Sequence, residues 1–308
     1  MDKVAFCFPG QGSVEVGMGR DIAEAVPEAM EVFERGSDAV GLDLRELCFE
    51  APLERLTQTE LQQPALVATS LAVLAALRAR GLEPDYVVGH SVGELAALAA
   101  VEAMTVEEAL ALVRERGLAM AEAARDRPGS MAAVLGLDDE VVENLCRKIL
   151  GVWPANYNCP GQIVVSGENM AVEELSAEAE SLGARRAIKL KVSGAFHSPL
   201  VASAAARLKP AIERVHFRDP IAPFMSTVTA RVEPAQRLGT LLVDQLTAPV
   251  KFTHAARALM QDGVRTFVEV GPGNVLSGLV KRIDRGVKAI SVNSLASLEQ
   301  LDESLASP

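Results

Sequence analysis

The chain has 308 residues, of which 49% are hydrophobic, and a formal net charge of −11 at pH 7. This length supports one large hydrophobic core or two smaller ones. The acidic balance, without any basic run, argues against nucleic acid and anionic membranes as partners. The N-terminal apolar run is too short for a secretory signal, and no later run approaches the ~20 apolar residues of a membrane span. We therefore expect a cytoplasmic protein.

Short apolar runs alternate with longer amphipathic segments, which is typical of a parallel sheet covered by helices. Residues 3–8 (KVAFCF), 86–88 (YVV) and 266–270 (TFVEV) predict strands, and a glycine-containing turn follows each of them. The second and third strands each lead into a predicted helix. The four cysteines are far apart and lack CxxC spacing, so neither a disulfide framework nor a zinc site is expected.

The middle of the chain predicts a different order of elements, β-α-β-β-α-β, which is the order of the ferredoxin-like unit. We therefore predict an α/β protein in which a small domain, residues 127–194, is inserted into a large domain formed by residues 1–126 and 195–308. Within the insert, strands are expected at 131–136, 153–158, 162–167 and 185–192, and helices at about 138–150 and 170–182.

Ser91 lies in the sequence GHSVGE, between a predicted strand and an alanine-rich helix. Gly89 and Gly93 allow the sharp strand-to-helix turn that exposes a nucleophilic Oγ. The N-terminal amides of the helix can stabilise negative charge that develops beside the serine. We predict that Ser91 is a nucleophile; a tight structural turn is the alternative.

A serine nucleophile needs a general base, and the chain has four histidines. His197 lies in the loop GAFHSP, where the chain returns from the predicted insert and a cleft between domains is expected. His90 adjoins Ser91 and is expected to point away from it, and His216 and His254 are expected to be structural or solvated. His197 is therefore the predicted base. A Ser-His dyad oriented by a backbone carbonyl and a full triad remain open.

The glycine-rich segment FPGQGSVEVGMG at residues 8–19 does not fit a phosphate-binding loop. It lacks the third glycine of GxGxxG, and Met18 stands where a phosphate-loop lysine belongs. We expect this turn to supply the backbone N–H of Gln11, together with that of Val92, to an oxyanion hole. A purely structural turn is the alternative.

Arg116 occupies the centre of the apolar stripe on a helix predicted at about residues 106–124. A guanidinium directed into a protein needs an anion, because an unpaired buried charge is costly. The functional interpretation is a bidentate site for a carboxylate on the substrate. A structural salt bridge or a snorkelling side chain is the alternative.

Motifs distributed over nearly the whole chain occur together in one order and spacing. They are GQGSVEVGMG, QQPAL, GHSVGE, RERGLAM, NYNCPGQIVVSG, GAFHS, QLTAPVKF and VEVGPGNVLSGLVKRI. This set resembles the malonyl-CoA:acyl carrier protein transacylases, the stand-alone acyltransferases of fatty acid and polyketide synthesis. The resemblance implies an α/β-hydrolase-like large domain with an inserted ferredoxin-like domain. It also implies a coenzyme A thioester as substrate, an acyl carrier protein as partner, and no cofactor or metal.

By position, Ser91 resembles the family's nucleophile and His197 its base, while Gln11 and Val92 resemble the residues that supply the oxyanion amides. Arg116 matches the arginine that pairs with the malonyl carboxylate. The implied reaction moves a malonyl group from malonyl-CoA to the phosphopantetheine thiol of the carrier protein through an acyl-enzyme on the serine. A serine esterase or thioesterase, a non-catalytic carrier-binding module and a trans-acting polyketide loader remain alternatives.

Further positions of the chain match the family less directly. Gln245 matches the residue whose carbonyl orients the histidine, and Gln63 and Asn158 correspond to pocket positions. Phe196 resembles the malonyl-type pattern rather than that of methylmalonyl-selective domains. Val92 replaces the leucine of many members, which leaves its backbone N–H unaffected.

The sequence RRAIKLKV places Arg185, Lys189 and Lys191 on one face of a predicted strand and apolar residues on the other. An acidic carrier protein that approaches an acidic enzyme needs such a local positive patch. We predict that these three residues form its docking face on a monomeric enzyme; an ordinary solvated face is the alternative.

Overall fold

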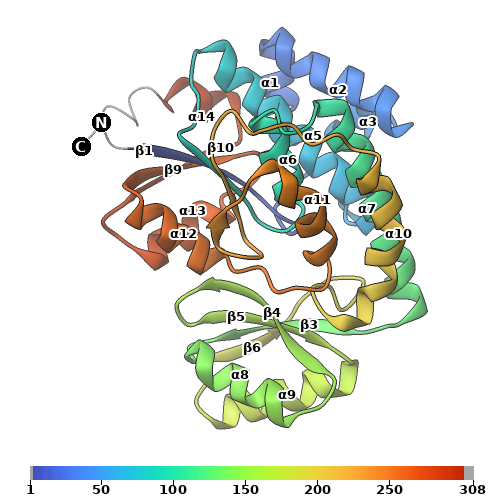
Figure 1. Cartoon of the computed structure of the whole chain (residues 1–308), viewed down its shortest axis with the longest axis vertical. Coiled ribbons are helices and arrows are strands. Elements are labelled where there is room, and N and C mark those ends of the chain that lie inside the picture. The colour runs from blue at the N-terminus through green and yellow to red at the C-terminus, as the bar shows by residue number, and fades with distance from the viewer. Residues whose placement is uncertain (1–2, 302–308) are drawn as a thin grey trace.

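The computed structural model, which describes residues 3–301, contains a large and a small β-sheet (Figure 1). The large sheet has six strands in the order β10-β9-β1-β2-β7-β8. Its neighbouring strands are parallel except for β7 and β8, which pair antiparallel. The strands are β1 (Lys3–Phe8), β2 (Tyr86–Gly89), β7 (Phe224–Ser226), β8 (Arg231–Val232), β9 (Val264–Val270) and β10 (Lys288–Val292).

Strand β1 lies inside the large sheet and is buried on both faces. Phe6 and Phe8 belong to the core formed with the long helices, whereas Ala5 and Cys7 belong to a second core on the opposite face. Successive side chains of a strand point to opposite faces, so a continuous apolar run suits a sheet that is covered on both sides. The three strands predicted at residues 3–8, 86–88 and 266–270 are confirmed.

Helices cover both faces of this sheet. Helices α2 (Pro27–Val40), α5 (Thr59–Ala79), α6 (Gly93–Ala100) and α7 (Val106–Asp126) contribute to the first core, and α12 (Phe252–Gln261) and α13 (Val275–Ile283) to the second. The remaining helical segments are α1 (Arg20–Ala25), α3 (Leu44–Phe49), α4 (Leu53–Leu56), a 3₁₀ turn (Pro199–Val201), α10 (Ala202–Glu213), α11 (Ala235–Asp244) and α14 (Leu295–Glu299).

Helix α5 is the one helix in the described chain that is long and apolar enough to cross a membrane by length and composition. Of its most apolar window, 83% is buried inside the protein. It packs between α2 and α7 in the first core, which accounts for its apolar composition without a membrane.

The small sheet has four antiparallel strands in the order β4-β5-β3-β6, and its helices α8 and α9 cover one face (Figure 1). The other face lies toward the large sheet. The order β-α-β-β-α-β predicted from the sequence is therefore correct. The elements are β3 (Ser130–Leu135), α8 (Asp139–Lys148), β4 (Val152–Cys159), β5 (Gln162–Gly167), α9 (Asn169–Ser181) and β6 (Arg186–Lys189).

Strand β6 is shorter than the strand predicted over residues 185–192. It ends at Lys189, and the chain then turns toward the large sheet, where Leu190 and Val192 line a cavity. The alternation of the sequence is retained, since Lys189 lies beside α9 and pairs with Glu173, on the face opposite Leu190.

Backbone hydrogen bonds join the small sheet to the C-terminal part of the chain. The Tyr157 N–H donates to the Val250 carbonyl at 2.8 Å, and the Val250 N–H donates to the Ala155 carbonyl at 2.8 Å. These bonds hold strand β4 opposite the carboxyl ends of β1 and β2, which form the edge at which α/β sheets bind ligands.

The turn between β2 and α6 is sterically constrained. Ser91 has φ of 54°, in the left-handed region. A Cβ on Gly89 would lie 2.2 Å from the Glu94 nitrogen, and a Cβ on Gly93 would lie 2.1 Å from the Phe8 carbonyl oxygen. Both obstacles are backbone atoms, so only glycine permits this approach of α6 to β1 and β2.

We expect Gly93→Ala to lower the free energy of unfolding by about 1–3 kcal/mol, because the new methyl group forces backbone atoms apart. Gly278→Ala in α13 is the matched control, since its Cβ would meet no atom within 4 Å. In a helix interior this change is expected to stabilise by roughly 0.5–1 kcal/mol. Urea unfolding of both variants measures the difference, and equal effects would contradict the steric argument.

Candidate active site

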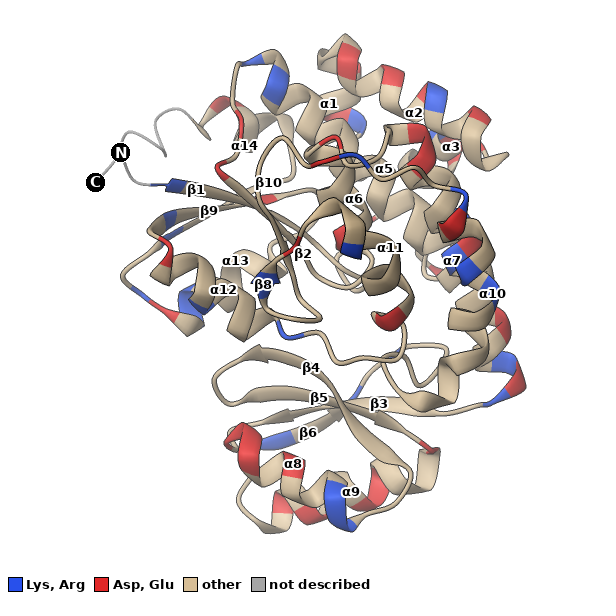
Figure 2. Cartoon of the chain, viewed as in Figure 1, with Lys and Arg blue, Asp and Glu red and all other residues tan. Residues whose placement is uncertain are grey.

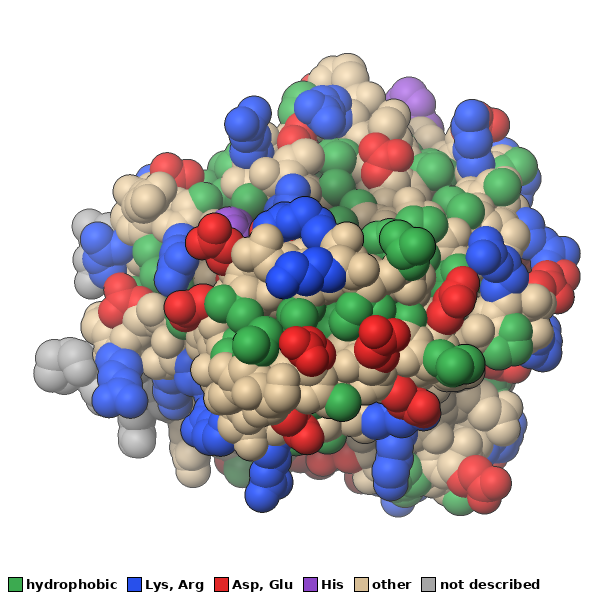
Figure 3. Space-filling model, turned by 90° about the horizontal axis from the view of Figure 1, so that it is seen from below, with side chains coloured by type: hydrophobic (Ala, Val, Ile, Leu, Met, Phe, Trp, Pro, Cys, Tyr) green, Lys and Arg blue, Asp and Glu red, His purple; other side chains and the backbone are tan. Residues whose placement is uncertain are grey.

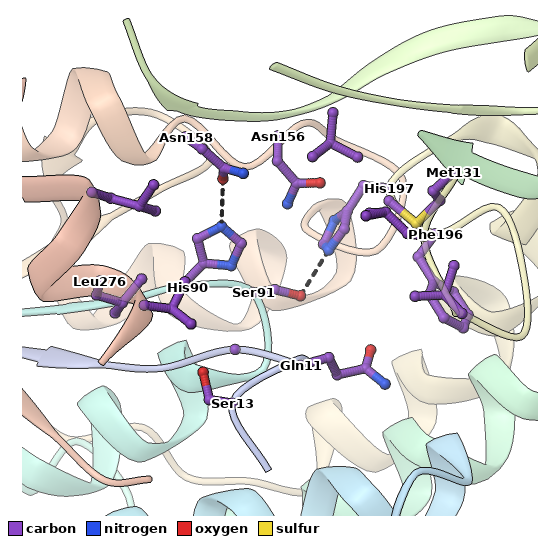
Figure 4. Close-up of a pocket in the computed structure, with 16 residues that line it drawn as sticks. Gln11, Ser13, His90, Ser91, Met131, Asn156, Asn158, Phe196, His197 and Leu276 are labelled. Atoms are coloured by element: carbon purple, nitrogen blue, oxygen red, sulfur yellow. Dashed lines mark hydrogen bonds between the residues drawn. The ribbon is translucent and has the colours of Figure 1, made fainter. Parts of the chain in front are cut away.

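A cavity of about 140 Å³ lies where the turns after β1 and β2 face strand β4 (Figure 4). Gln11 comes from the first turn and Ser91 from the second. Asn156 of β4 lies across the cavity, and Phe196 and His197 of the loop after β6 line one side of it. Segments far apart in the sequence thus converge on one small space.

Ser91 and His197 form a hydrogen-bonded pair. The distance between Ser91 Oγ and His197 Nε2 is 2.7 Å. His197 Nδ1 lies 2.9 Å from the Gln245 carbonyl oxygen and 3.2 Å from that of Ala248. Because carbonyl oxygens only accept, Nδ1 carries the proton and the Nε2 lone pair faces the serine hydroxyl. Among residues 3–301 no carboxylate bonds to His197, so the arrangement is a dyad oriented by carbonyls, one of the two arrangements left open by the sequence.

The environment keeps His197 neutral. Burial and, second, the charge of Arg116 lower the pKa of its imidazole to about 3. Nε2 is therefore free to accept a proton throughout the neutral pH range, as a general base requires.

Arg116 projects from α7 into the same site and is 1% exposed. Its Nη1 donates to Gln63 Oε1 at 2.6 Å, and its Nη2 donates to Ser91 Oγ at 3.1 Å and to Gln245 Oε1 at 3.0 Å. No acidic group of the described residues lies within ion-pair distance. The guanidinium is thus held by neutral acceptors, one of them Ser91 Oγ, which excludes the structural salt bridge considered from the sequence. Burial lowers the pKa of Arg116 to about 10, so it stays charged at neutral pH.

Gln245 links the dyad to Arg116 in a way that the sequence did not reveal. The resemblance implied a role for its carbonyl, whereas its side chain also bonds Arg116 through Oε1 and the Glu94 carboxylate through Nε2. In the sequence, Glu94, in the first turn of α6, belongs to the motif GHSVGE and has no separate predicted role. Its position in the otherwise apolar sequence GELAALAA indicates that Glu94 is buried, where a carboxylate needs polar partners.

Gln11 and Val92 place backbone N–H groups near Ser91. Neither N–H donates to any acceptor within residues 3–301, so both are available to an anion. The Val92 side chain is fully buried and does not line the cavity, which leaves only its backbone to contribute. The Gln11 side chain instead donates to Gln62 Oε1 at 2.8 Å.

Gln63 and Phe196 lie at different depths of the site. Gln63 is fully buried and does not line the cavity; its amide oxygen supports Arg116 and its amide nitrogen lies 3.3 Å from Met120 Sδ. Phe196 lines the cavity directly.

Asn156 is buried and also lines the cavity. The sequence does not predict it, because nothing in NYNCPG distinguishes Asn156 from Asn158.

Asn158 lines the cavity and accepts a hydrogen bond from His90, whose Nε2 lies 3.0 Å from its Oδ1 (Figure 4). Burial lowers the pKa of His90, and its ring points to Asn158 rather than to Ser91. His216 and His254 are exposed. The expectation that these three histidines do not serve the serine agrees with their placement.

Comparison with known proteins identifies the chain. The model of the acyl transferase domain family matches residues 5–304. The malonyl CoA-acyl carrier protein transacylase of Bacillus subtilis (strain 168) is 43% identical over 304 residues, which cover 97% of this chain and 96% of that protein. The chain belongs to the malonyl CoA-acyl carrier protein transacylase family.

Solved structures of this transacylase family have the same mixed α/β fold, with a mainly parallel sheet and a separate antiparallel sheet. MCAT from Streptococcus pneumoniae superposes with a TM-score of 0.94 at 41% identity, covering 98% of this chain and 99% of that one. A type II PKS acyl-carrier protein has been solved in complex with its malonyl-transacylase. That transacylase superposes with a TM-score of 0.94 at 37% identity, covering 98% of this chain and 99% of that one.

We expect the rate constant for acylation of Ser91 to show no inflection near pH 6.5, the ordinary pKa of histidine, because burial lowers the pKa of His197 to about 3. Rapid-quench measurement of the acyl-enzyme between about pH 5 and 8 tests this, since an ordinary histidine titrates within that range. An acid limb centred near 6.5 would contradict the buried, neutral base.

The same shift affects stability in a defined direction. Between about pH 3 and pH 6.5 the imidazole of His197 is protonated in the unfolded chain and neutral in the folded protein. Its contribution to the free energy of unfolding is therefore complete above pH 6.5 and is lost as the pH falls toward 3.

Proposed function

We propose that this protein transfers the malonyl group of malonyl-CoA to the phosphopantetheine thiol of an acyl carrier protein, in the cytoplasm. The observation that carries the proposal is Arg116, a charged, buried guanidinium with only neutral acceptors, 3.1 Å from the nucleophilic oxygen of Ser91. Such a group is matched by an acyl chain that ends in a carboxylate. The names of the relatives and the complex with a carrier protein support the same substrates.

In the first half-reaction, the Ser91 hydroxyl proton passes to His197 Nε2 as Oγ attacks the thioester carbonyl. The negative charge that forms on the carbonyl oxygen is stabilised by the free N–H groups of Gln11 and Val92. The C–S bond then breaks, the coenzyme A sulfur takes the proton from His197, and the malonyl group remains as an ester on Ser91.

In the second half-reaction, the phosphopantetheine thiol gives its proton to His197 and attacks the ester carbonyl. The same N–H groups stabilise the second tetrahedral intermediate, and the departing Ser91 oxygen recovers the proton. Protons and electron pairs balance over the two steps, so the residues of this chain supply the whole reaction without a cofactor.

Arg116 exchanges partners in this scheme. The guanidinium that donates to Ser91 Oγ in the free enzyme turns its Nη2 toward the malonyl carboxylate, while Gln63 continues to hold Nη1. A serine esterase that acts on neutral acyl groups would make no use of this buried charge, whereas an acyl group that ends in a carboxylate pairs with it. The buried arginine therefore favours the transferase over the esterase.

We propose that the large part is α/β-hydrolase-like and that the small sheet with α8 and α9 is a ferredoxin-like insert, with domains at residues 1–126, 127–194 and 195–308. The strand order β4-β5-β3-β6 supports the second assignment. The two separate cores of the large sheet and the third core beneath α8 and α9 support the division.

For the carrier protein, the structure favours the Arg185 end of the predicted docking face. Lys189 is paired with Glu173, and acidic residues recur along the neighbouring helices α8 and α9 (Figure 2). Seen from that side, the surface carries interspersed acidic, basic and apolar side chains (Figure 3). Repulsion by these acidic groups makes this face a poor match for an acidic partner.

Arg185 instead lines an open groove together with Arg186 and Arg282. Two of its lining residues lie close in the chain to residues of the active-site cavity: Cys159 follows Asn158 in β4, and Arg282 lies about one helical turn beyond Leu279 in α13. We propose that an acidic surface of the carrier protein docks here, which places its phosphopantetheine near the entrance to the cavity.

Arg116→Ala is expected to lower kcat/KM for malonyl-CoA by about 10²–10³, because it removes a desolvated, charge-assisted pair. Acetyl-CoA has no carboxylate to lose, so its kcat/KM should stay the same or rise. Intact-mass measurement of the acyl-enzyme with each thioester tests the preference, and Ser91→Ala, which should form no adduct, is the control for the attachment site. An unchanged malonyl-to-acetyl ratio in a folded Arg116→Ala variant would refute the carboxylate site.

Arg185→Glu combined with Arg186→Glu should raise KM for the carrier protein about tenfold or more and leave KM for malonyl-CoA unchanged. Lys189→Glu combined with Lys191→Glu makes the same change in charge at the other end of the segment RRAIKLKV, where Lys189 pairs with Glu173 of α9, and should have the smaller effect. Steady-state transfer assays with both variants measure the two values. A larger effect at Lys189 and Lys191 would move docking to the Lys189 end of the predicted face, and no effect of either pair would exclude both ends as the docking site.

A further inference from the structure

A buried carboxylate lies behind Arg116 and Gln245. Glu94 is 1% exposed and accepts three hydrogen bonds. Its Oε1 accepts from the Thr227 N–H at 2.6 Å and from Thr227 Oγ1 at 2.7 Å, and its Oε2 accepts from Gln245 Nε2. Burial raises the pKa of Glu94, while the donors from Thr227 and Gln245 and the charge of Arg116 act to lower it.

The carboxylate fixes the polarity of the Gln245 amide. An amide has a donor end and an acceptor end, and an ionised carboxylate can only accept. Glu94 therefore selects the NH₂ end, which turns Oε1 toward Arg116 at 3.0 Å. With the amide reversed, two sets of N–H donors would face each other and two oxygens would be opposed. The backbone carbonyl of the same Gln245 orients His197, so one residue sets both groups.

The charge of Glu94 reaches Arg116 only across this amide. The two groups attract each other, yet within the described chain they do not form a direct ion pair. A carboxylate placed directly on the guanidinium would satisfy it and compete with an anionic substrate. Separation by one amide keeps Arg116 charged and oriented while leaving it able to bind another carboxylate.

We propose that Glu94 is a positioning residue for substrate selection, which acts through Gln245 to hold Arg116 charged and directed at Ser91 without occupying it. This inference rests on the proposed function. It differs from a purely structural role because it predicts a selective loss with the dicarboxylic thioester rather than an equal loss with every substrate.

Glu94→Gln tests the proposal with little change in shape. The new amide cannot accept from both Thr227 and Gln245, so Arg116 loses its fixed partner. We expect kcat/KM for malonyl-CoA to fall about tenfold or more, mainly through KM, and kcat/KM for acetyl-CoA to change much less. An equal loss on both thioesters, or an unchanged ratio, would overturn the proposal.

Glu269→Gln is the matched control. Glu269 is also 1% exposed and accepts from the backbone N–H groups of Leu276 at 3.0 Å and Ser277 at 2.8 Å. Its replacement should lower the melting temperature and leave the malonyl-to-acetyl ratio unchanged. A shift of the ratio in this variant equal to that in Glu94→Gln would show that any buried carboxylate has the effect, and would also overturn the proposal.

Combining Glu94→Gln with Gln245→Glu separates hydrogen bonding from charge placement. The pair restores a donor facing an acceptor in the contact between the two side chains, and it restores the original net charge, but it puts the carboxylate directly on Arg116. We expect the melting temperature to recover relative to Glu94→Gln and malonyl transfer to remain low. Full recovery of malonyl transfer would overturn the proposal.

If Glu94→Gln does not fold, Thr227→Val removes the hydroxyl donor to the carboxylate and keeps the other two, the backbone N–H of residue 227 and Gln245 Nε2. A smaller fall in the malonyl-to-acetyl ratio is expected there, and no fall would refute the inference. The wild-type acyl-enzyme separates the two levels of argument. Absence of a malonyl adduct on wild type would refute the proposed function itself, whereas a normal adduct with unchanged ratios in the variants would refute only the role of Glu94.

Discussion

The site depends on one electrostatic constraint, a positive charge buried without a direct counter-ion. Arg116 would be costly in an apolar core if its donors were unmet, and the structure meets them with Gln63, Gln245 and the nucleophile. Neutral acceptors satisfy the hydrogen bonds without cancelling the charge. Burial and, second, this same charge lower the pKa of His197, so Arg116 helps to keep the imidazole neutral.

The fold makes this arrangement possible by bringing separate elements to one edge of the large sheet. The constrained turn after β2 holds Ser91 at the start of α6, and α7 runs close enough for Arg116 to reach it. The loop after β6 supplies His197, and the end of α11 supplies Gln245. Each contribution is local in sequence, and none of them forms a site alone.

Most elements, and the meeting of Ser91, His197 and Arg116 at one candidate site, could be predicted from the sequence, because their signals are local. Apolar runs marked the strands, flanking glycines marked Ser91, and the position of Arg116 within an apolar stripe marked it as buried. The Glu94 to Gln245 contact could not be predicted, since it joins residues 151 positions apart through side chains. The predicted length of β6 was wrong. The alternation of polar and apolar residues continues past Lys189, whereas the chain leaves the sheet there and lines the cavity.

The bonds between β4 and Val250 have a mechanical consequence for the dyad. Val250 lies two residues beyond Ala248 and five beyond Gln245, whose carbonyls orient His197. Strand β4 forms the opposite wall of the cavity through Asn156 and Asn158. A displacement of that wall is therefore transmitted along a few bonds of backbone to the acceptors of the imidazole. The width of the cavity and the orientation of the His197 ring therefore depend on the same short segment, residues 245–250.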